Sequence, residues 1–287
     1  MMSAVEKFRW REGIKLALPK EHGSWSLALE PVALGLLVAP TAAGAALAVA
    51  AVSGFFLRRP LKILSREQDY ERWQTARASV FALALTAAIG LLLAAKIGGM
   101  EKLWPLLPAA LAGLVFVWCD RRNAAREGAA ETAGAVAFGL LPAAFGALAN
   151  LSVPASLALA AVMLVRSVPT VLTVRANLRI KKGQAVSILP ALLAAGVGLA
   201  LCAWLVSIRL APWTAAFFAA VFAVRTVWLL CWRPRLAGRT IGMVEATLGG
   251  LMVLALAGTW KNFDANKPKF ESFSRKSCPI RESNCPD

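Results

Sequence analysis

The feature that most constrains this chain is a series of apolar blocks, each about as long as a membrane is thick. A helix needs roughly 20 apolar residues to cross a ~30 Å hydrocarbon core, and only a helix satisfies its own backbone within such a block. The predicted spans are 24–39, 41–57, 78–95, 103–119, 129–149, 153–174, 185–207, 211–232 and 240–259. We therefore predict an all-α, polytopic membrane protein with about nine transmembrane helices in one bundle.

Composition agrees with this class of protein. Hydrophobic residues make up 58% of the 287 residues and charged residues only 17%, whereas soluble domains have about 45–50% and 25%. The net charge of +16 would suit nucleic acid, but the charges lie between the apolar blocks and form no basic soluble face. The lipid bilayer is therefore the expected partner, and nucleic acid is not.

The basic residues are concentrated in alternate connections. Counting Lys and Arg, 21 lie in residues 1–23, 58–77, 119–128, 175–184 and 233–239, and the opposite connections hold only Lys96, Lys102 and Arg209. Connections rich in Lys and Arg stay in the cytoplasm. We expect a multi-pass protein of the bacterial inner membrane, with a basic cytoplasmic arm (1–23), a transmembrane domain (24–259) and an extracytoplasmic C-terminus.

Two local questions stay open at this level. The first two spans meet at 39–41, so they form either a tight hairpin or one long, broken segment. The polar tail (260–287) contains Cys278 and Cys285, on the side of the membrane where disulfides persist. These cysteines form either a disulfide loop or two free thiols.

Ionisable side chains inside the apolar blocks are the strongest functional candidates, because each is costly in the bilayer unless it is paired or hydrated. They are Glu30, Arg166, Arg225 and Glu245. Arg225 and Glu245 lie on consecutive spans, both about 8–11 Å from the connecting turn at 1.5 Å per residue. We predict an ion pair between them that ties the last two helices together.

A polar stripe lies on the sixth span. Arg166, Thr170, Thr173 and Asn177 follow one another at helical spacing, which places them on one face. Such a stripe either lines a hydrated cavity with an anion site at its mouth or supplies hydrogen bonds between helices. The chain has one His and lacks the common phosphate-loop and zinc-site motifs, so we expect neither a metal nor a cofactor.

Several segments resemble a known family. PKEHGSW (19–25), FFLRRPLK (55–62), VRANLR (174–179) and IGMVEATLGG (241–250) resemble landmarks of the YwiC-like family of bacterial membrane proteins. The layout is more remotely similar to the UbiA-type intramembrane prenyltransferases, which are nine-helix bundles with a cytoplasmic N-terminus. That similarity implies a UbiA-like bundle with active-site segments at 58–77 and 175–184.

The departure from the prenyltransferases concerns their metal site. Those enzymes hold Mg²⁺ with aspartates in both segments, because Mg²⁺ prefers oxygen ligands. Here 175–184 contains no acid, and 58–77 contains only Glu67, Asp69 and Glu71. We therefore do not expect Mg²⁺-dependent prenyl transfer, although direct phosphate binding by Arg and Lys remains chemically reasonable.

The preferred prediction is an integral membrane protein that binds an anionic isoprenoid or lipid at its cytoplasmic side. The expected ligand-binding residues are Lys20, Arg58, Arg59, Arg166, Arg175, Asn177 and Arg179. The candidates for proton chemistry are Glu21, His22 and Glu30, because His titrates near neutrality and an apolar environment favours a neutral carboxyl group. If the protein is an enzyme, it is transferase-like and acts on a lipid or isoprenoid.

Two alternatives stay open. In the first, the protein transports a small anion or solute along a path lined by Glu30, Arg166, Arg225 and Glu245. In the second, it helps to assemble a membrane complex through its basic surface and its tail.

Overall fold

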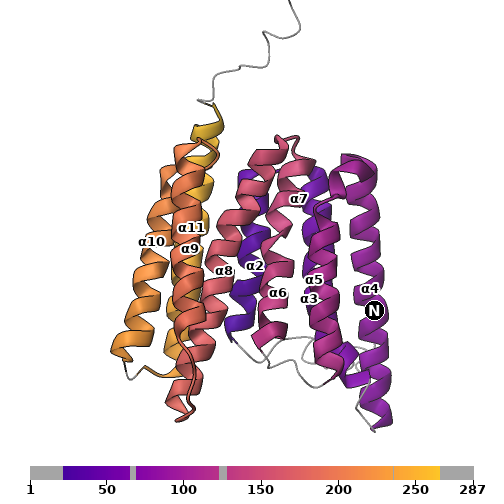
Figure 1. Ribbon diagram of the computed structural model, residues 1–287. Helices are drawn as coiled ribbons and strands as arrows, with labels where there is room; N and C mark the ends of the chain where they lie inside the picture. The colour runs from indigo at the N-terminus through magenta and orange to yellow at the C-terminus, as the bar shows by residue number, and fades with distance from the viewer. Residues whose placement is uncertain (1–21, 65–68, 123–127, 235, 266–287) are drawn as a thin grey trace, which may run out of the picture.

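The computed structural model describes residues 22–64, 69–122, 128–234 and 236–265, and these residues form helices and turns with no β-strand. The helices are α2 (His22–Val38), α3 (Ala42–Leu64), α4 (Tyr70–Gly98), η1 (Met100–Leu103), α5 (Leu106–Arg121), α6 (Gly128–Gly139), α7 (Leu141–Leu148), α8 (Val153–Lys181), α9 (Leu189–Ser207), α10 (Trp213–Val227), η2 (Trp228–Trp232) and α11 (Gly238–Ala265). Figure 1 shows them as a bundle of roughly parallel and antiparallel rods.

Seven helical segments of the described chain are long and apolar enough to cross a membrane. They are Ala42–Leu64, Tyr70–Gly98, Gly128–Leu148, Val153–Lys181, Leu189–Ser207, Trp213–Trp232 and Gly238–Trp260. Two of the predicted spans coincide with shorter apolar helices, Trp25–Val38 and Leu106–Cys119. The structure thus fits an all-α, multi-pass membrane protein, whereas the count of nine spans stays a prediction.

One predicted span differs from the structure in its continuity. Residues 129–149 were expected to form one helix, but α6 ends at Gly139 and α7 begins at Leu141. Pro142 has no N–H and cannot donate to the carbonyl of Phe138, which interrupts the helical ladder. The Ala143 amide instead donates to the Leu140 carbonyl at 3.1 Å, so the break is a tight turn within the span.

The first two helices form a hairpin, which answers one of the open questions. α2 ends at Val38, and the Thr41 hydroxyl accepts a hydrogen bond from the Gly44 amide at 2.9 Å at the start of α3. Val32 of α2 then packs in one apolar cluster with Leu47 of α3. Figure 1 shows the α7–α8 turn at the same end of the bundle.

The helix ends that flank the basic connections lie at the opposite end of the bundle. Figure 1 shows the adjoining ends of α3 and α4, of α5 and α6, of α8 and α9, and of α10 and α11 at the lower end of the bundle. We call this the basic end.

Helix α2 belongs to both apolar cores of the bundle. Leu34 is fully buried in the core formed mainly by α8 to α11, and Val32 lies in the core shared with α3, α4 and α7. A close approach is possible at Gly35, where an added Cβ would lie 2.8 Å from the Cβ of Phe145 on α7. α2 is therefore held between the two groups of helices, and this position brings Glu30 to the candidate site.

Candidate functional site

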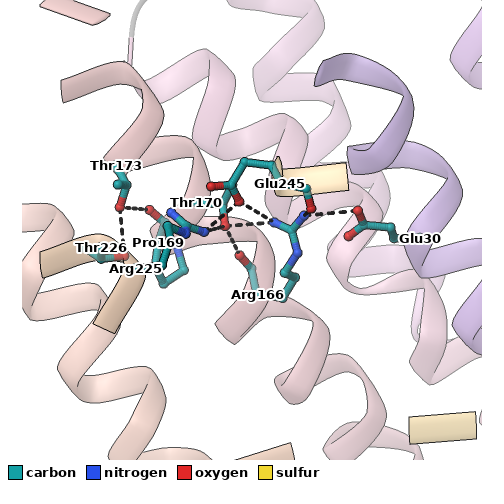
Figure 2. Close-up of polar contacts among 8 residues, drawn as sticks. All are labelled: Glu30, Arg166, Pro169, Thr170, Thr173, Arg225, Thr226 and Glu245. Carbon is teal, nitrogen blue, oxygen red and sulfur yellow. Dashed lines mark hydrogen bonds and ion pairs between the residues drawn. The ribbon is translucent and has the colours of Figure 1, made fainter. Parts of the chain in front are cut away.

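The candidate site is a set of four buried, charged side chains from four helices. Glu30 comes from α2, Arg166 from α8, Arg225 from α10 and Glu245 from α11. Each is between 3% and 7% exposed, and Figure 2 shows them in one continuous series of polar contacts. We call these four residues the charge network. With two guanidinium and two carboxylate groups it is electrically neutral when all four are ionised.

Arg166 lies at the centre of the network. Its Nη2 donates to Oε1 of Glu30 and to the backbone carbonyl of Glu245, both at 3.0 Å. Its Nη1 donates to the Thr170 hydroxyl at 2.8 Å and lies 3.8 Å from Oε2 of Glu245. This one side chain thus joins α2, α8 and α11.

Arg225 completes the network from α10. Its Nη2 donates to Oε2 of Glu245 at 2.8 Å and to the Thr170 hydroxyl at 2.7 Å, so the two residues expected to pair lie in direct contact. The Phe222 ring lies beneath both guanidinium groups, with its centroid 4.9 Å from Cζ of Arg166 and 5.4 Å from Cζ of Arg225. Attraction to the ring face stabilises cations in such positions.

Some polar atoms of the network have no hydrogen-bond partner among the described residues. They are Nε of Arg166, Nε and Nη1 of Arg225, and Oε1 of Glu245. Buried polar atoms are nearly always hydrogen-bonded in folded proteins, so such exceptions require an explanation. The network therefore has donor and acceptor capacity that its own contacts do not use.

A glycine makes room for the Glu30 carboxylate. Gly249 lies one helical turn after Glu245 on α11, and a Cβ at Gly249 would overlap the carboxylate of Glu30. The lack of a side chain at Gly249 allows the Glu30 carboxylate to approach the α11 backbone and meet Arg166 beside it.

The lower part of the polar stripe on α8 faces α10. The hydroxyls of Thr173 and Thr226 lie 3.2 Å apart and share a hydrogen bond. Asn177 Nδ2 donates to the carbonyl of Leu229 at 2.9 Å. That carbonyl lies in the π-helix η2, which continues α10. In a π-helix the amide five residues later would donate to it, but that residue is Pro234, which has no N–H. From Thr173 to Asn177 the stripe thus supplies hydrogen bonds between helices, which was one of the two roles expected for it.

The residues expected to hold a head group are distributed over several contacts near the basic end. Nη1 of Arg175 lies 2.9 Å from Oε2 of Glu131 on α6, and the two side chains are 15% and 37% exposed. The Arg58 guanidinium lies 4.5 Å from the centroid of the Phe116 ring on α5. Arg59 is half-buried and Arg179 is exposed.

Other predicted residues lie outside the part of the chain that the structure describes. Lys20, Glu21, Cys278 and Cys285 fall outside the described residues, and His22 begins α2 with a side chain that is not described. Of the three candidates for proton chemistry, only Glu30 is therefore placed. Among the described residues, no group of three or more His, Cys, Asp and Glu side chains could hold a metal ion.

Sequence reasoning missed three contributors to the site, Phe222, Thr226 and Gly249. Each lies close in sequence to a charged member of the network, and Thr226 directly follows Arg225. Phe222 precedes Arg225 by three positions and Gly249 follows Glu245 by four, which places each on the same helical face as its charged neighbour. Helical spacing from the charged residues could therefore have identified Phe222 and Gly249 as neighbours of the network.

Comparison with known proteins gives one similarity. The family model described as YwiC-like protein matches residues 18–145, a range that begins near the PKEHGSW segment and extends into α7. The resemblance seen in the sequence is thereby confirmed over this range. No curated protein and no solved structure matches the chain.

Proposed function

We propose that this chain, which matches the YwiC-like family over residues 18–145, is a membrane transport protein for a small anion. The observation that carries the proposal is the charge network, in which four ionisable residues from four helices converge inside an apolar bundle. Ionisable groups at such depth in membrane proteins are rare, and they typically mark ion, proton or substrate paths.

A purely structural role accounts less well for this arrangement. Desolvating charged pairs costs several kcal/mol per ion, so well-packed apolar residues often stabilise a fold as well or better. The network also keeps the unused donors of Arg166 and Arg225. Guanidinium groups bind oxyanions and halides through such N–H groups. A transported anion is a suitable partner for them.

The basic end supports an approach path for anions. A concentration of Lys and Arg raises the local anion concentration, and the stripe on α8 runs from this end to Arg166. In this structure the Thr173–Thr226 and Asn177–Leu229 contacts close the route between α8 and α10. Transport thus requires these two hydrogen bonds to open.

The transport experiment uses purified protein in liposomes and isotope-labelled chloride, lactate, sulfate and succinate. We expect saturable uptake of at least one of these anions over protein-free liposomes. Arg225→Gln should abolish this uptake, and Arg209→Gln, which changes an exposed residue of the α9–α10 turn, should leave it unchanged. Uptake at the protein-free level for all four anions would refute the proposal.

For the arrangement in the membrane we propose nine spans, with the basic end in the cytoplasm and a UbiA-like order of helices. α2 and α5 have 17 and 16 residues, or lengths of roughly 26 and 24 Å at 1.5 Å per residue. Both are shorter than the ~30 Å hydrocarbon core, and local thinning of the bilayer or adjoining turns can make up the missing length. Reporter fusions after residue 260 test the parity. An extracytoplasmic reporter there agrees with an odd number of spans, and a cytoplasmic one contradicts nine. Reporters in the α2–α3 and α4–α5 connections distinguish nine spans from the seven long ones, because nine spans place both connections outside the cytoplasm.

A second candidate function is the binding of an anionic isoprenoid or lipid at the basic end. The supporting observation is that one predicted head-group residue contacts α6 and another contacts a ring that borders α6. Arg175 pairs with Glu131, and Arg58 lies on Phe116, whose ring would contact a Cβ placed at Gly134. Native mass spectrometry of wild type and an Arg58→Ala/Arg175→Ala variant tests it. A phosphorylated isoprenoid lost from the variant supports the candidate, and bulk phospholipid in both samples contradicts it.

A further inference from the structure

We infer that the charge network carries one monovalent anion together with one proton, and that Glu245 is the group that takes the proton. This inference rests on the proposed transport function and names its substrate class and its coupling. It follows from the charge balance of the network, from the unused hydrogen-bonding atoms, and from the different surroundings of the two carboxylates.

The charge balance comes first. The two guanidinium and two carboxylate groups of the network sum to zero. A monovalent anion bound among them would leave a net charge of −1 in a buried, apolar region, where an uncompensated charge is strongly unfavourable. The uptake of one proton by a carboxylate restores neutrality. A divalent anion would require both carboxylates to be protonated, so the network favours a monovalent one.

The position of the anion follows from the contacts of Arg225. Nη2 of Arg225 already binds Oε2 of Glu245 and the Thr170 hydroxyl, whereas its Nε and Nη1 have no partner among the described residues. An anion at this guanidinium gains those two donors. It then competes with the Glu245 carboxylate for the positive charge of Arg225.

The two carboxylates differ in how firmly they are held. The Glu30 carboxylate accepts from Arg166 at 3.0 Å and occupies the space above Gly249. Glu245 has one oxygen, Oε1, without a partner, and its Oε2 contacts Arg225 at 2.8 Å and Arg166 at 3.8 Å. Loss of its contact with Arg225 therefore leaves Glu245 with a single weak ion pair.

Within the part of the chain that the structure describes, the charged groups around Glu245 are those of the network itself. α2 contributes Glu30, α8 contributes Arg166 and α10 contributes Arg225. When an anion takes the Arg225 guanidinium, the proton adds to a carboxylate oxygen of Glu245 and converts it from –COO⁻ to –COOH. Release of the anion on the other side returns the proton to water and re-forms the ion pair, so each cycle moves one anion, one proton and no net charge.

The test uses the same proteoliposomes with a pH-sensitive dye trapped inside and inward gradients of chloride and, separately, of lactate. The wild-type protein should acidify the interior with one proton for each labelled anion that enters. Clamping the membrane potential with potassium and valinomycin should leave the initial rate unchanged. This measurement requires no variant, so a folding defect cannot obscure it.

The matched variants are Glu245→Gln and Glu71→Gln. Glu245→Gln removes the proton acceptor but keeps Arg225 accessible, so anion uptake should continue with loss of the internal acidification and with a new dependence on membrane potential. Glu71 is exposed on α4, and Glu71→Gln should behave as wild type. Anion uptake without acidification in the wild type overturns the coupling and leaves the transport function intact. Uptake confined to sulfate and succinate overturns the monovalent class, whereas uptake of none of the four anions refutes transport itself.

Discussion

Gly249 offers a direct way to test whether the charge network has the geometry described. In Gly249→Ala the new Cβ would lie 2.5 Å from Oε2 of Glu30 and nearer still to the other carboxylate atoms. Cβ atoms in proteins essentially never come within 3.0 Å of a non-bonded heavy atom of another part of the chain. The carboxylate must therefore move, and its 3.0 Å contact with Arg166 breaks or lengthens.

The magnitude follows from two opposing effects. Breaking a buried ion pair by displacing one partner costs about 3–5 kcal/mol, and replacing Gly by Ala within a helix returns roughly 1 kcal/mol. We expect a net loss of about 2–4 kcal/mol in the free energy of unfolding. At about 2–4 °C per kcal/mol this lowers the melting temperature by roughly 5–15 °C.

The neighbouring glycine supplies the control. A Cβ at Gly250 meets nothing within 4 Å, so Gly250→Ala should keep or slightly raise the melting temperature. The assay is the loss of the peak of folded protein on size-exclusion chromatography after heating protein purified in mild detergent. Equal melting temperatures for the two alanine variants would show that Glu30 does not occupy the space above Gly249.

A double-variant cycle separates the clash with Glu30 from other effects of the added methyl group. Glu30→Ala is itself destabilising because it leaves Arg166 without its closest carboxylate. In that background Gly249→Ala should cost almost nothing further, because the atoms it would overlap are gone, and the coupling should equal most of the single-variant effect. The same loss in both backgrounds would refute the proposed reason for the glycine.

Two further substitutions distinguish the buried contacts from the exposed ones. Arg175→Gln should lower the free energy of unfolding by less than about 1 kcal/mol, since its pair with Glu131 is partly open to solvent; a loss as large as that of Gly249→Ala would contradict this. Asn177→Ala should lower the free energy of unfolding by about 1–3 kcal/mol, because it leaves the carbonyl of Leu229 without its side-chain donor. A melting temperature equal to that of wild type would show that this hydrogen bond contributes nothing.

Much of the helical arrangement was predictable because the bilayer imposes a simple requirement on sequence. Every predicted span falls on an apolar helix, since each block had to satisfy its own backbone in hydrocarbon. The break at Leu140 was not predicted, because Pro142 lies within an otherwise continuous apolar block. The left-handed conformation of Arg233, with a φ of 49° where η2 ends, had no clear signal in the sequence either.

The members of the charge network could be identified from sequence, but only one of their contacts could. Arg225 and Glu245 lie on consecutive helices at similar distances from a short turn, so their proximity followed from helix geometry. The contact of Glu30 with Arg166 joins residues 136 positions apart. It depends on α2 lying against α8 and α11, and helical periodicity gives no information about which non-consecutive helices are neighbours.

That contact also determines how motion in one part of the bundle reaches the other. Glu30 is the one member of the network within residues 18–145, the range shared with the YwiC-like family, and α2 packs in both apolar cores. A displacement of α2 relative to α8 lengthens the contact of Glu30 with Arg166, which in turn changes how far Arg166 supports Glu245. Under the proposed transport function, anion binding at Arg225 and the position of α2 would therefore be coupled through Arg166. If transport alternates between two arrangements of this bundle, the opening of the α8–α10 contacts should be accompanied by a movement of α2 against α8 and α11.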